Sequence, residues 1–426
     1  MKKALFFVLV LLPFCMQAQY KDTIRLTLPE AEKLFLEKNY YLLAQKFNIQ
    51  VADAAIRQAR LWYNPTFFFE TNFYNPHTGR VFNYGENNAN GTPYYNNGQF
   101  QAQITQMINI AGKRSKMVHM AKVNKNLEQL AFDDLMRVLR LQIYETYTDL
   151  YAALHKKELL LTEQKNLTFL VQLTGMQMKQ GVVSGYELTR LQFELQNNDA
   201  TLLDLNNQVT ENEQLLKLLL RMDPSDFVYP SDIPQTEDKP MPMLEAGYDS
   251  ALLKRPDRSI AEMNIKYNQS SLRVERATAV PNLTLGATYD RYGNAYTNYT
   301  GLNIAMDIPV FNRNQGNIKK AEVLVDKSKA AYEFNEEVIR EEVISAYKKI
   351  MDVNTLNANI QPNYVESLQN ISIEATRNYD RRVISLLDYL DKIRTYKNAQ
   401  FNLIDLQINN FQTRQYFNYV TNAKFF

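Results

Sequence analysis

The sequence predicts a mainly α-helical chain with four short β-strands, which cross a membrane as part of a barrel shared by several chains. Three observations indicate this fold class: very long helical tracts without proline, four segments in which apolar and polar residues alternate, and a twofold repetition of this arrangement. The chain has only 13 glycines in 426 residues, which is expected when most residues lie in long helices.

Residues 1–18 have the pattern of a secretory signal peptide. Lys2 and Lys3 precede an apolar run, residues 4–13, and the small residue Ala18 ends the segment. Because this run is too short to span a bilayer as a helix, we expect a cleaved signal rather than a membrane anchor.

Cys15 is the only cysteine and lies inside this segment, so the mature chain is expected to have no disulfide and no thiolate metal ligand. Lipidation of Cys15 is the alternative, although the bulky Phe14 stands where the lipoprotein pattern requires a small residue. Removal of Lys2 and Lys3 changes the formal net charge from +2 to 0. A balanced chain without a basic run argues against a nucleic-acid partner. No later apolar run approaches the length of a transmembrane helix.

The first repeat, residues 19–221, is predicted to contain three helical tracts. A capping box of Thr27 and Glu30 begins the first tract, which should extend to about Tyr63. The second tract, residues 114–179, contains no proline and would be roughly 100 Å long at ~1.5 Å per residue. A helix of this length needs neighbours of equal length.

The third tract, residues 185–221, carries a heptad pattern. Leucines recur at alternating steps of three and four residues, and Asn198 and Asn212 occupy polar positions in the same row. This pattern predicts a coiled-coil seam in which the two asparagines set the register.

The second repeat, residues 244–426, follows a proline-rich linker, residues 222–243. It is predicted to contain helices over 244–278, over 317–379 with a kink or break at Pro362, and over 386–421. The order of elements matches the first repeat with a shift of ~200 residues, which indicates an internal duplication.

Each repeat contains two segments of alternating apolar and polar residues. These segments are 67–73, 100–108, 283–290 and 301–308. An alternation of period two predicts strands with one apolar and one polar face, and ~10 residues suffice for a tilted strand to cross a bilayer.

The connections between these strands are polar, as is typical of the outer end of a membrane barrel: they are residues 75–98 and 291–298. Four strands cannot close such a barrel, and an open edge in lipid would leave backbone groups unpaired. Closure therefore requires several chains.

Four short motifs carry a family resemblance that covers essentially the whole mature chain. They are Leu26-Thr27-Leu28-Pro29-Glu30-Ala31, its counterpart Arg255-Pro256-Asp257, and the helix-to-strand transitions Asn64-Pro65 and Pro281-Asn282. In their order and duplication they resemble the TolC family of outer-membrane factors.

The resemblance implies a homotrimer in the cell outer membrane, with a shared twelve-stranded β-barrel in contact with lipid and a long α-helical coiled-coil barrel in the periplasm. It implies a passive channel of a tripartite efflux or export system. A periplasmic adaptor (membrane fusion protein) would couple the channel to an inner-membrane pump. The resemblance implies no cofactor.

The predicted tips of the two helical hairpins carry the functional part of the resemblance. The residues implied to contact the adaptor are Gly181, Val182, Val183 and Ser184 at the first tip, and Val383, Ile384 and Ser385 at the second. The residues implied to line the pore entrance are Asp388, Asp391, Glu187 and Tyr379. Carboxylates repeated in three copies would attract cations and repel anions.

The second tip departs from the family pattern at two positions. Arg382 replaces the tip glycine, so the turn must either differ or be strained. Ile384 stands where the type member has an arginine that helps to hold the closed state, so that latch is not predicted here.

The sequence offers no catalytic or metal site. His77, His119 and His155 share no metal-ligand spacing, and there is neither a phosphate-binding glycine loop nor a nucleophile elbow. Met176 and Met178 could pass on a soft metal, but methionine at helical positions usually serves packing. The sequence therefore predicts no enzyme.

The alternative function is that of a soluble periplasmic coiled-coil adaptor or scaffold. Such adaptors carry one long hairpin between β-rich halves, whereas this chain is predicted to have two hairpins and four strands. The transported substrate stays open at this point among metal ions, drugs and proteins.

Overall fold

The computed structural model describes most of the chain. The described residues are 22–76, 79–82, 99–233, 239–291, 298–360 and 364–426. The predicted signal peptide with Cys15, most of the loops 75–98 and 291–298, His77 and the predicted break at Pro362 lie outside the described residues.

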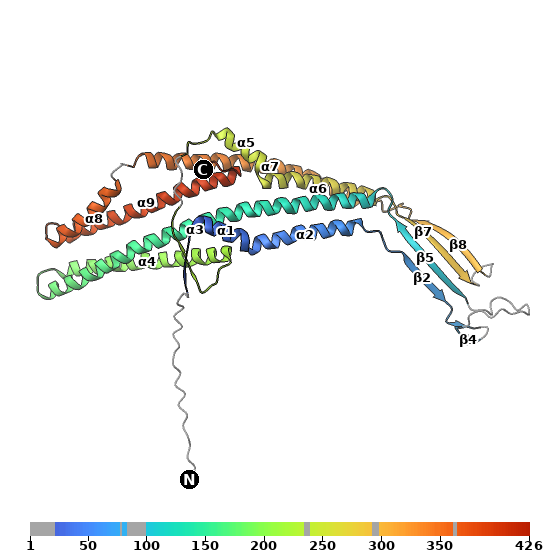
Figure 1. Cartoon of the computed structure of the whole chain (residues 1–426), viewed down its shortest axis with the longest axis horizontal. Helices are drawn as coiled ribbons and strands as arrows, with labels where there is room; N and C mark the ends of the chain where they lie inside the picture. The colour runs from blue at the N-terminus through green and yellow to red at the C-terminus, as the bar shows by residue number, and fades with distance from the viewer. Residues whose placement is uncertain (1–21, 77–78, 83–98, 234–238, 292–297, 361–363) are drawn as a thin grey trace, which may run out of the picture. The chain divides into compact units, whose positions relative to one another are not determined.

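Long helices make up most of the structure (Figure 1). In chain order they are α1 (Leu28–Lys38), α2 (Tyr40–Arg60), α3 (Lys113–Lys179), α4 (Gly185–Leu220), α5 (Leu244–Lys254), α6 (Pro256–Thr278), α7 (Gln315–Ala358), α8 (Tyr364–Asp380) and α9 (Leu386–Thr421). Helix α3 has 67 residues, as the proline-free tract predicted. Among the described residues, no helix is both long and apolar enough to cross a membrane.

The strands are short. They are β1 (Thr23–Leu26), β2 (Thr66–Thr71), β3 (Tyr74–Asn75), β4 (Arg80–Val81), β5 (Phe100–Ile108), β6 (Phe227–Pro230), β7 (Leu283–Arg291) and β8 (Asn298–Met306). The four predicted alternating segments correspond to β2, β5, β7 and β8, although Phe73 and Ile308 fall outside the strands that were predicted to include them.

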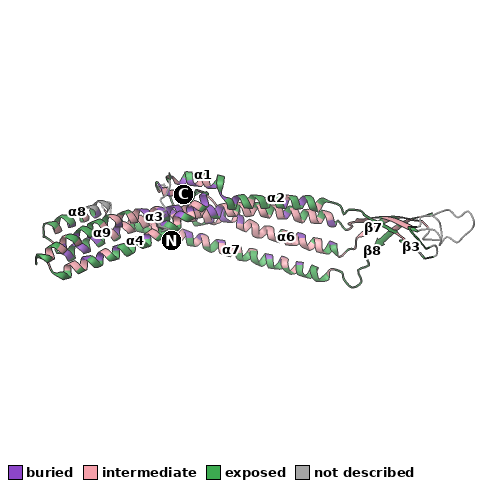
Figure 2. Cartoon of the chain, turned by 90° about the horizontal axis from the view of Figure 1, so that it is seen from below, coloured by how far each residue is buried: buried purple, intermediate pink, exposed green. Residues whose placement is uncertain are grey.

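The chain forms two compact units. The hairpin unit comprises the residues up to Leu43, Leu135–Lys254 and Ile339–Phe426, and the sheet unit comprises Ala44–Asp134 and Arg255–Val338. Figure 2 shows that buried residues concentrate in the packed helices, whereas the residues of β7 and β8 are exposed or half-buried.

The first predicted helix is interrupted at Asn39, so the prediction of one continuous helix to Tyr63 was wrong. The predicted capping box is confirmed, since the Thr27 N–H and hydroxyl both donate to the Glu30 carboxylate at 2.8 Å. The Asn39 side chain accepts hydrogen bonds from the backbone N–H groups of the next turn and donates to the Leu219 carbonyl at 2.8 Å. This long-range bond fixes the break between α1 and α2.

A matching break separates α5 from α6 in the second half, where one helix was also predicted. Arg255 precedes Pro256 and adopts an extended conformation, because the proline ring excludes the helical one. The Arg255 side chain is 2% exposed and forms an ion pair with Asp257 at 2.6 Å.

The coiled-coil seam of α4 is confirmed with two changes, of which the first is that Glu194 is buried and Leu195 only half-buried. Leu191, Leu202 and Leu216 are buried, and Asn198 is buried with its amide donating to the Leu160 carbonyl at 3.2 Å. At the second polar position the buried residue is Glu213 and not Asn212.

Two apolar clusters hold the hairpin unit together. One joins both hairpins near their tips and contains Leu167, Leu170, Leu191, Ala375, Leu386, Tyr389, Leu390 and Ile393. The other surrounds Phe417 and contains Ala251, Ile339, Val343, Ala346, Ile350 and Val420.

The proline-rich linker contains a strand that was not predicted. Strand β6 pairs in parallel with β1, and Val228 at its centre is fully buried. The pattern of four residues is too short to indicate a strand, and the partner lies about two hundred residues away in the chain.

The main sheet contains four antiparallel strands in the order β2-β5-β7-β8. Its register places Phe67, Ile104, Ala287 and Leu302 in one row across all four strands. The row beside it, on the opposite face, contains Phe68, Gln103, Thr288 and Gly301. In these two rows the predicted apolar and polar faces are present, except for Phe68.

The apolar face of this sheet is the exposed one. Leu302 is 90% exposed, Ile304 is 74% exposed and Phe67 is 66% exposed. A sheet that packs on a water-soluble core buries its apolar face instead. The exposed apolar face is the arrangement expected of strands that face lipid.

Candidate functional site: the two hairpin tips

The first tip joins α3 to α4 through a turn that closes the preceding helix. The Gly181 N–H donates to the Met178 carbonyl at 3.0 Å, and the Val182 N–H donates to the Gln177 carbonyl at 2.9 Å. These two bonds form a Schellman motif, in which Gly181 adopts the left-handed conformation with φ of 73°. Ser184 then begins α4 by accepting a hydrogen bond from the Glu187 N–H at 3.4 Å.

The second tip joins α8 to α9 through the same turn. The Arg382 N–H donates to the Tyr379 carbonyl at 2.9 Å, and the Val383 N–H donates to the Asn378 carbonyl at 2.8 Å. Arg382 has φ of 57°, the conformation that Gly181 adopts at the first tip. The sequence left open whether this turn differs from the first or is strained. The structure shows the same turn, so it is strained, because a residue with a side chain in the left-handed conformation costs roughly 1–2 kcal/mol.

Each tip presents one apolar side chain to solvent. Val182 is 50% exposed and Val383 is 68% exposed, and both follow the left-handed residue of their turn. The next residues, Val183 and Ile384, are half-buried, and Ile384 packs on the apolar cluster that joins the hairpins. The position that holds the family's latch arginine therefore serves packing in this chain.

Asp388 has a local structural role that the sequence analysis did not assign. Its carboxylate accepts hydrogen bonds from the Ser385 hydroxyl at 2.6 Å and the Ser385 N–H at 3.3 Å, which completes a capping box at the start of α9. These hydrogen bonds hold the pKa of Asp388 below its usual range, so the carboxylate stays charged. The spacing Ser385-x-x-Asp388 was the available signal.

Asp391 lies one turn further along α9 and is exposed, as Asp388 is. These two carboxylates are therefore presented to solvent on neighbouring turns of one helix. Two cations of the same helix lie near them, since Lys392 interacts electrostatically with Asp388 and Arg394 with Asp391.

Tyr379 of α8 lies within electrostatic range of Glu187 of α4. The Tyr379 ring stacks on that of Tyr389 with 4.8 Å between centroids. Burial raises the pKa of Tyr379, and the nearby carboxylate of Glu187 raises it further. The structure thus places Glu187 near Tyr379, whereas the other two predicted entrance residues, Asp388 and Asp391, lie on α9.

Ion pairs and hydrogen bonds between the two hairpins were missed by the sequence analysis. Glu194 of α4 is 6% exposed and forms a two-pronged ion pair with Arg394 of α9, which lowers the pKa of Glu194. Lys156 contacts Asp405 at 2.5 Å. The partners lie about two hundred residues apart in the chain, so no local pattern could indicate them.

No group of three or more metal-ligating side chains occurs in the portion of the chain that the structure describes. His119 lies on α3 of the sheet unit and His155 on α3 of the hairpin unit, where it contacts the Tyr151 ring.

The sequence matches the family model of the outer membrane efflux proteins over residues 33–220 and 247–415. The chain is 21% identical over 304 residues to the cobalt-zinc-cadmium resistance protein CzcC of Cupriavidus metallidurans, covering 71% of this chain and 72% of CzcC. It is 27% identical over 295 residues to the probable outer membrane lipoprotein SilC of Salmonella typhimurium, covering 66% of this chain and 57% of SilC.

A solved channel has the same fold. The structure is similar to the CmeC outer membrane channel of Campylobacter jejuni, with a TM-score of 0.74 at 15% identity, over 93% of this chain and 86% of CmeC. These matches favour a channel over the alternative of a soluble adaptor or scaffold. The chain belongs to the outer membrane efflux protein family and is a passive efflux duct of the outer membrane with its helical part in the periplasm, not an enzyme.

Proposed function

We propose that three copies of this chain form one efflux duct, in which their sheets close a twelve-stranded barrel. The observation that carries the proposal is the four-stranded sheet with an exposed apolar face and with β2 and β8 at its two edges. In lipid, an edge strand without a neighbour leaves backbone groups unpaired, and pairing β2 of one copy with β8 of the next removes every edge.

We also propose that the chain arose by duplication of one helix–strand–hairpin unit. The first repeat is 19–221 and the second is 244–426, with a linker at 222–243 and a signal peptide at 1–18. The support is the repeated order of elements, the matching breaks at Asn39 and Arg255, and the identical turns at the two tips.

The two tips are the surfaces that we propose for contact with a periplasmic adaptor, which links the duct to an inner-membrane pump. The contact residues are Gly181, Val182, Val183 and Ser184 of the first tip and Val383, Ile384 and Ser385 of the second. The exposed Val182 and Val383 support this assignment, because exposed apolar side chains at the end of a hairpin favour burial against a partner.

The proposed pore entrance consists of Asp388, Asp391, Glu187 and Tyr379. Three copies would bring six exposed carboxylates of α9 to one constriction, which concentrates cations there. We propose divalent metal cations as the cargo, since the related CzcC is named as a cobalt-zinc-cadmium resistance protein and the entrance chemistry suits such ions.

The tips are tested with charged substitutions in the native host. Deletion of the gene should increase sensitivity to zinc, cobalt or cadmium, and the wild-type gene should restore growth. Val182→Asp with Val383→Asp should fail to restore growth while the protein reaches the outer membrane in normal amount, because an aspartate at each tip opposes burial of the contact.

Ile373→Asp is the matched control, since Ile373 is 57% exposed on α8 but lies away from the turn. It should restore growth. Full growth with the tip double variant would contradict the adaptor contact, and a deletion strain without metal sensitivity would contradict the cargo.

A further inference from the structure

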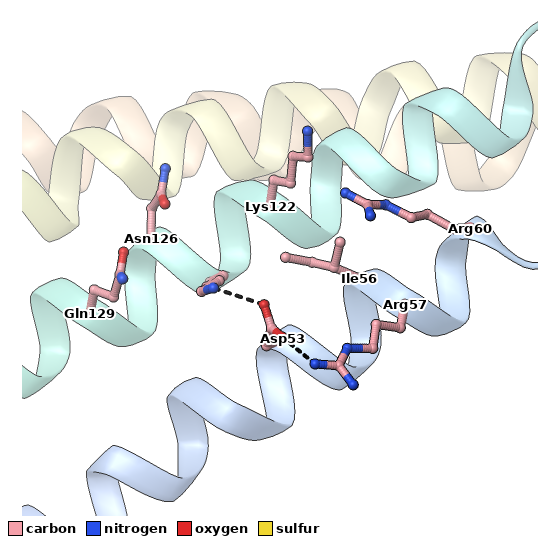
Figure 3. A pocket seen from close by; sticks show the side chains of 8 residues that line it. Asp53, Ile56, Arg57, Arg60, Lys122, Asn126 and Gln129 are labelled. Atoms are coloured by element: carbon pink, nitrogen blue, oxygen red, sulfur yellow. Dashed lines mark hydrogen bonds and ion pairs between the residues drawn. The ribbon is translucent and has the colours of Figure 1, made fainter.

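Four of the eight residues that line a groove between α2 and α3 in the sheet unit are cationic (Figure 3). Its cavity has a volume of about 490 Å³ and is lined by Asp53, Ile56, Arg57, Arg60, Lys122, Lys125, Asn126 and Gln129. A second cavity of about 600 Å³ shares Arg60 and Lys122 with it and adds Arg114 and His119. Together the two cavities are lined by five arginines and lysines and by one carboxylate.

The single carboxylate of the groove is already engaged. Asp53 forms ion pairs with Lys125 at 2.8 Å and with Arg57 at 3.4 Å. Among the described residues, no hydrogen bond or ion pair is found for the side chains of Arg60 and Lys122. The groove therefore keeps an excess of positive charge beyond the pairs of Asp53, since no described residue forms an ion pair with Arg60 or Lys122.

Two of these cations, Arg60 and Arg114, lie at helix ends that face the membrane strands, and Lys122 lies about 14 Å further along α3 at ~1.5 Å per residue. Helix α2 ends at Arg60, shortly before β2 begins at Thr66, and α3 begins at Lys113, shortly after β5 ends at Ile108. These helix ends are therefore at the periplasmic boundary of the outer membrane, provided that the sheet crosses it as proposed above.

Trp62 lies at the same boundary. The Arg114 guanidinium lies over the Trp62 ring at 4.0 Å, and Trp62 is 61% exposed. Exposed tryptophan beside a membrane-spanning segment is typical of the headgroup level, where an apolar ring can meet both lipid and water. Because Arg114 lines the second cavity, this contact brings that cavity beside a tryptophan of the headgroup level.

We propose that this groove binds the phosphate of an anionic phospholipid headgroup in the periplasmic leaflet of the outer membrane. Arginine presents a planar fork that matches two phosphate oxygens, and lysine adds a point charge. Arg60 and Lys122 come from two helices that the phosphate would bridge (Figure 3). The bound lipid would tie α2 to α3 directly below the barrel.

The test uses the full protein purified in detergent and probed by native mass spectrometry with phosphatidylglycerol. Arg60→Gln with Lys122→Gln should weaken retention of this lipid by about thirtyfold, from about fivefold for each cation lost near a lipid phosphate. These two substitutions break no recorded ion pair, and oligomer mass and circular dichroism will show whether the fold is retained. The control, Lys319→Gln with Lys320→Gln, removes the same charge near the start of α7 outside the groove, and should retain the lipid.

Equal loss of lipid in the groove and control variants would overturn the site, as would equal retention of diacylglycerol, which has no phosphate. Complete displacement of phosphatidylglycerol by millimolar inorganic phosphate would assign the groove to free phosphate and overturn the lipid proposal. Because the oligomer is weighed in the same spectra, failure of the lipid site is distinguished from failure of the shared barrel.

Discussion

Leu302→Arg should destabilise the membrane-inserted protein by about 2–4 kcal/mol, the cost of an arginine on the lipid face of a barrel near the bilayer midplane. Leu302 occupies the middle of β8, pairs with Ala287 of β7 and is 90% exposed on the apolar face. The measurement is the free energy of unfolding from lipid vesicles, together with the amount of protein in the outer membrane.

Thr288→Arg is the matched control at the same depth. Thr288 follows Ala287 in β7, so its side chain lies on the opposite, polar face of the sheet. This variant should assemble in normal amount, because the polar face of a barrel lines its interior. Equal loss of stability in both variants would mean that the apolar face does not meet lipid.

Asp388→Asn with Asp391→Asn should reduce cation selectivity and weaken block by divalent cations by at least about tenfold in a planar bilayer recording. The change removes charge but leaves an amide oxygen that can accept the hydrogen bonds of Ser385, so the capping box at α9 is retained. The amount of assembled protein should not change.

The cation selectivity at the entrance should depend on salt and on pH. The selectivity of the wild type should decrease with salt, as the Debye length falls from ~10 Å at 0.1 M to ~3 Å at 1 M. Because the pKa of Asp388 is lowered in the folded chain, its charge is present above that pKa. The contribution of Asp388 to the selectivity should therefore persist as the pH falls to the ordinary carboxyl range and be lost only below it.

Asp199→Asn with Asp204→Asn is the control, since both residues are exposed carboxylates of α4 away from the tip. It should conduct as the wild type does. If the aspartates of α9 behave like this control, Asp388 serves only the capping box and the constriction must be sought at Glu187 and Tyr379.

The features that the sequence predicted depend on residues close together in the chain. The capping box at Thr27 needs only Glu30 three residues later, and the alternation of residues 283–290 identifies a strand and both its faces. What the sequence missed depends on distant partners. The break at Asn39 depends on the Leu219 carbonyl, and β6 is a strand because β1 lies beside it.

At the tips, too, local features can be read from the sequence and long-range contacts cannot. The position of the tips was predicted from local motifs and their capping serines had an unused local signal, whereas the ion pair of Glu194 with Arg394 joins two hairpins and has none. Arg382 is a different case, since its replacement of glycine predicted either a new turn or strain. Only the geometry shows that the hydrogen bonds of the first tip are repeated.

The central claim, one barrel closed by three copies, is tested most directly by disulfides between the sheet edges. Within one chain, β2 and β8 are separated by β5 and β7, which places the two edges about 14 Å apart at ~4.8 Å per strand. A disulfide requires Cα atoms about 4.4–6.8 Å apart, so a bond between β2 and β8 must join two chains.

Cysteines should be placed at Thr66 or Phe68 of β2 together with Asn303 or Ala305 of β8, on one face of the sheet, so that the set samples neighbouring registers. With oxidant, at least one pair should produce covalent species of two and three chains and nothing larger, because a closed ring of three has no edge left. The shared barrel would be contradicted by covalent species of more than three chains or by species of two chains only. It would also be contradicted if no pair gave a covalent species in the membrane-inserted protein.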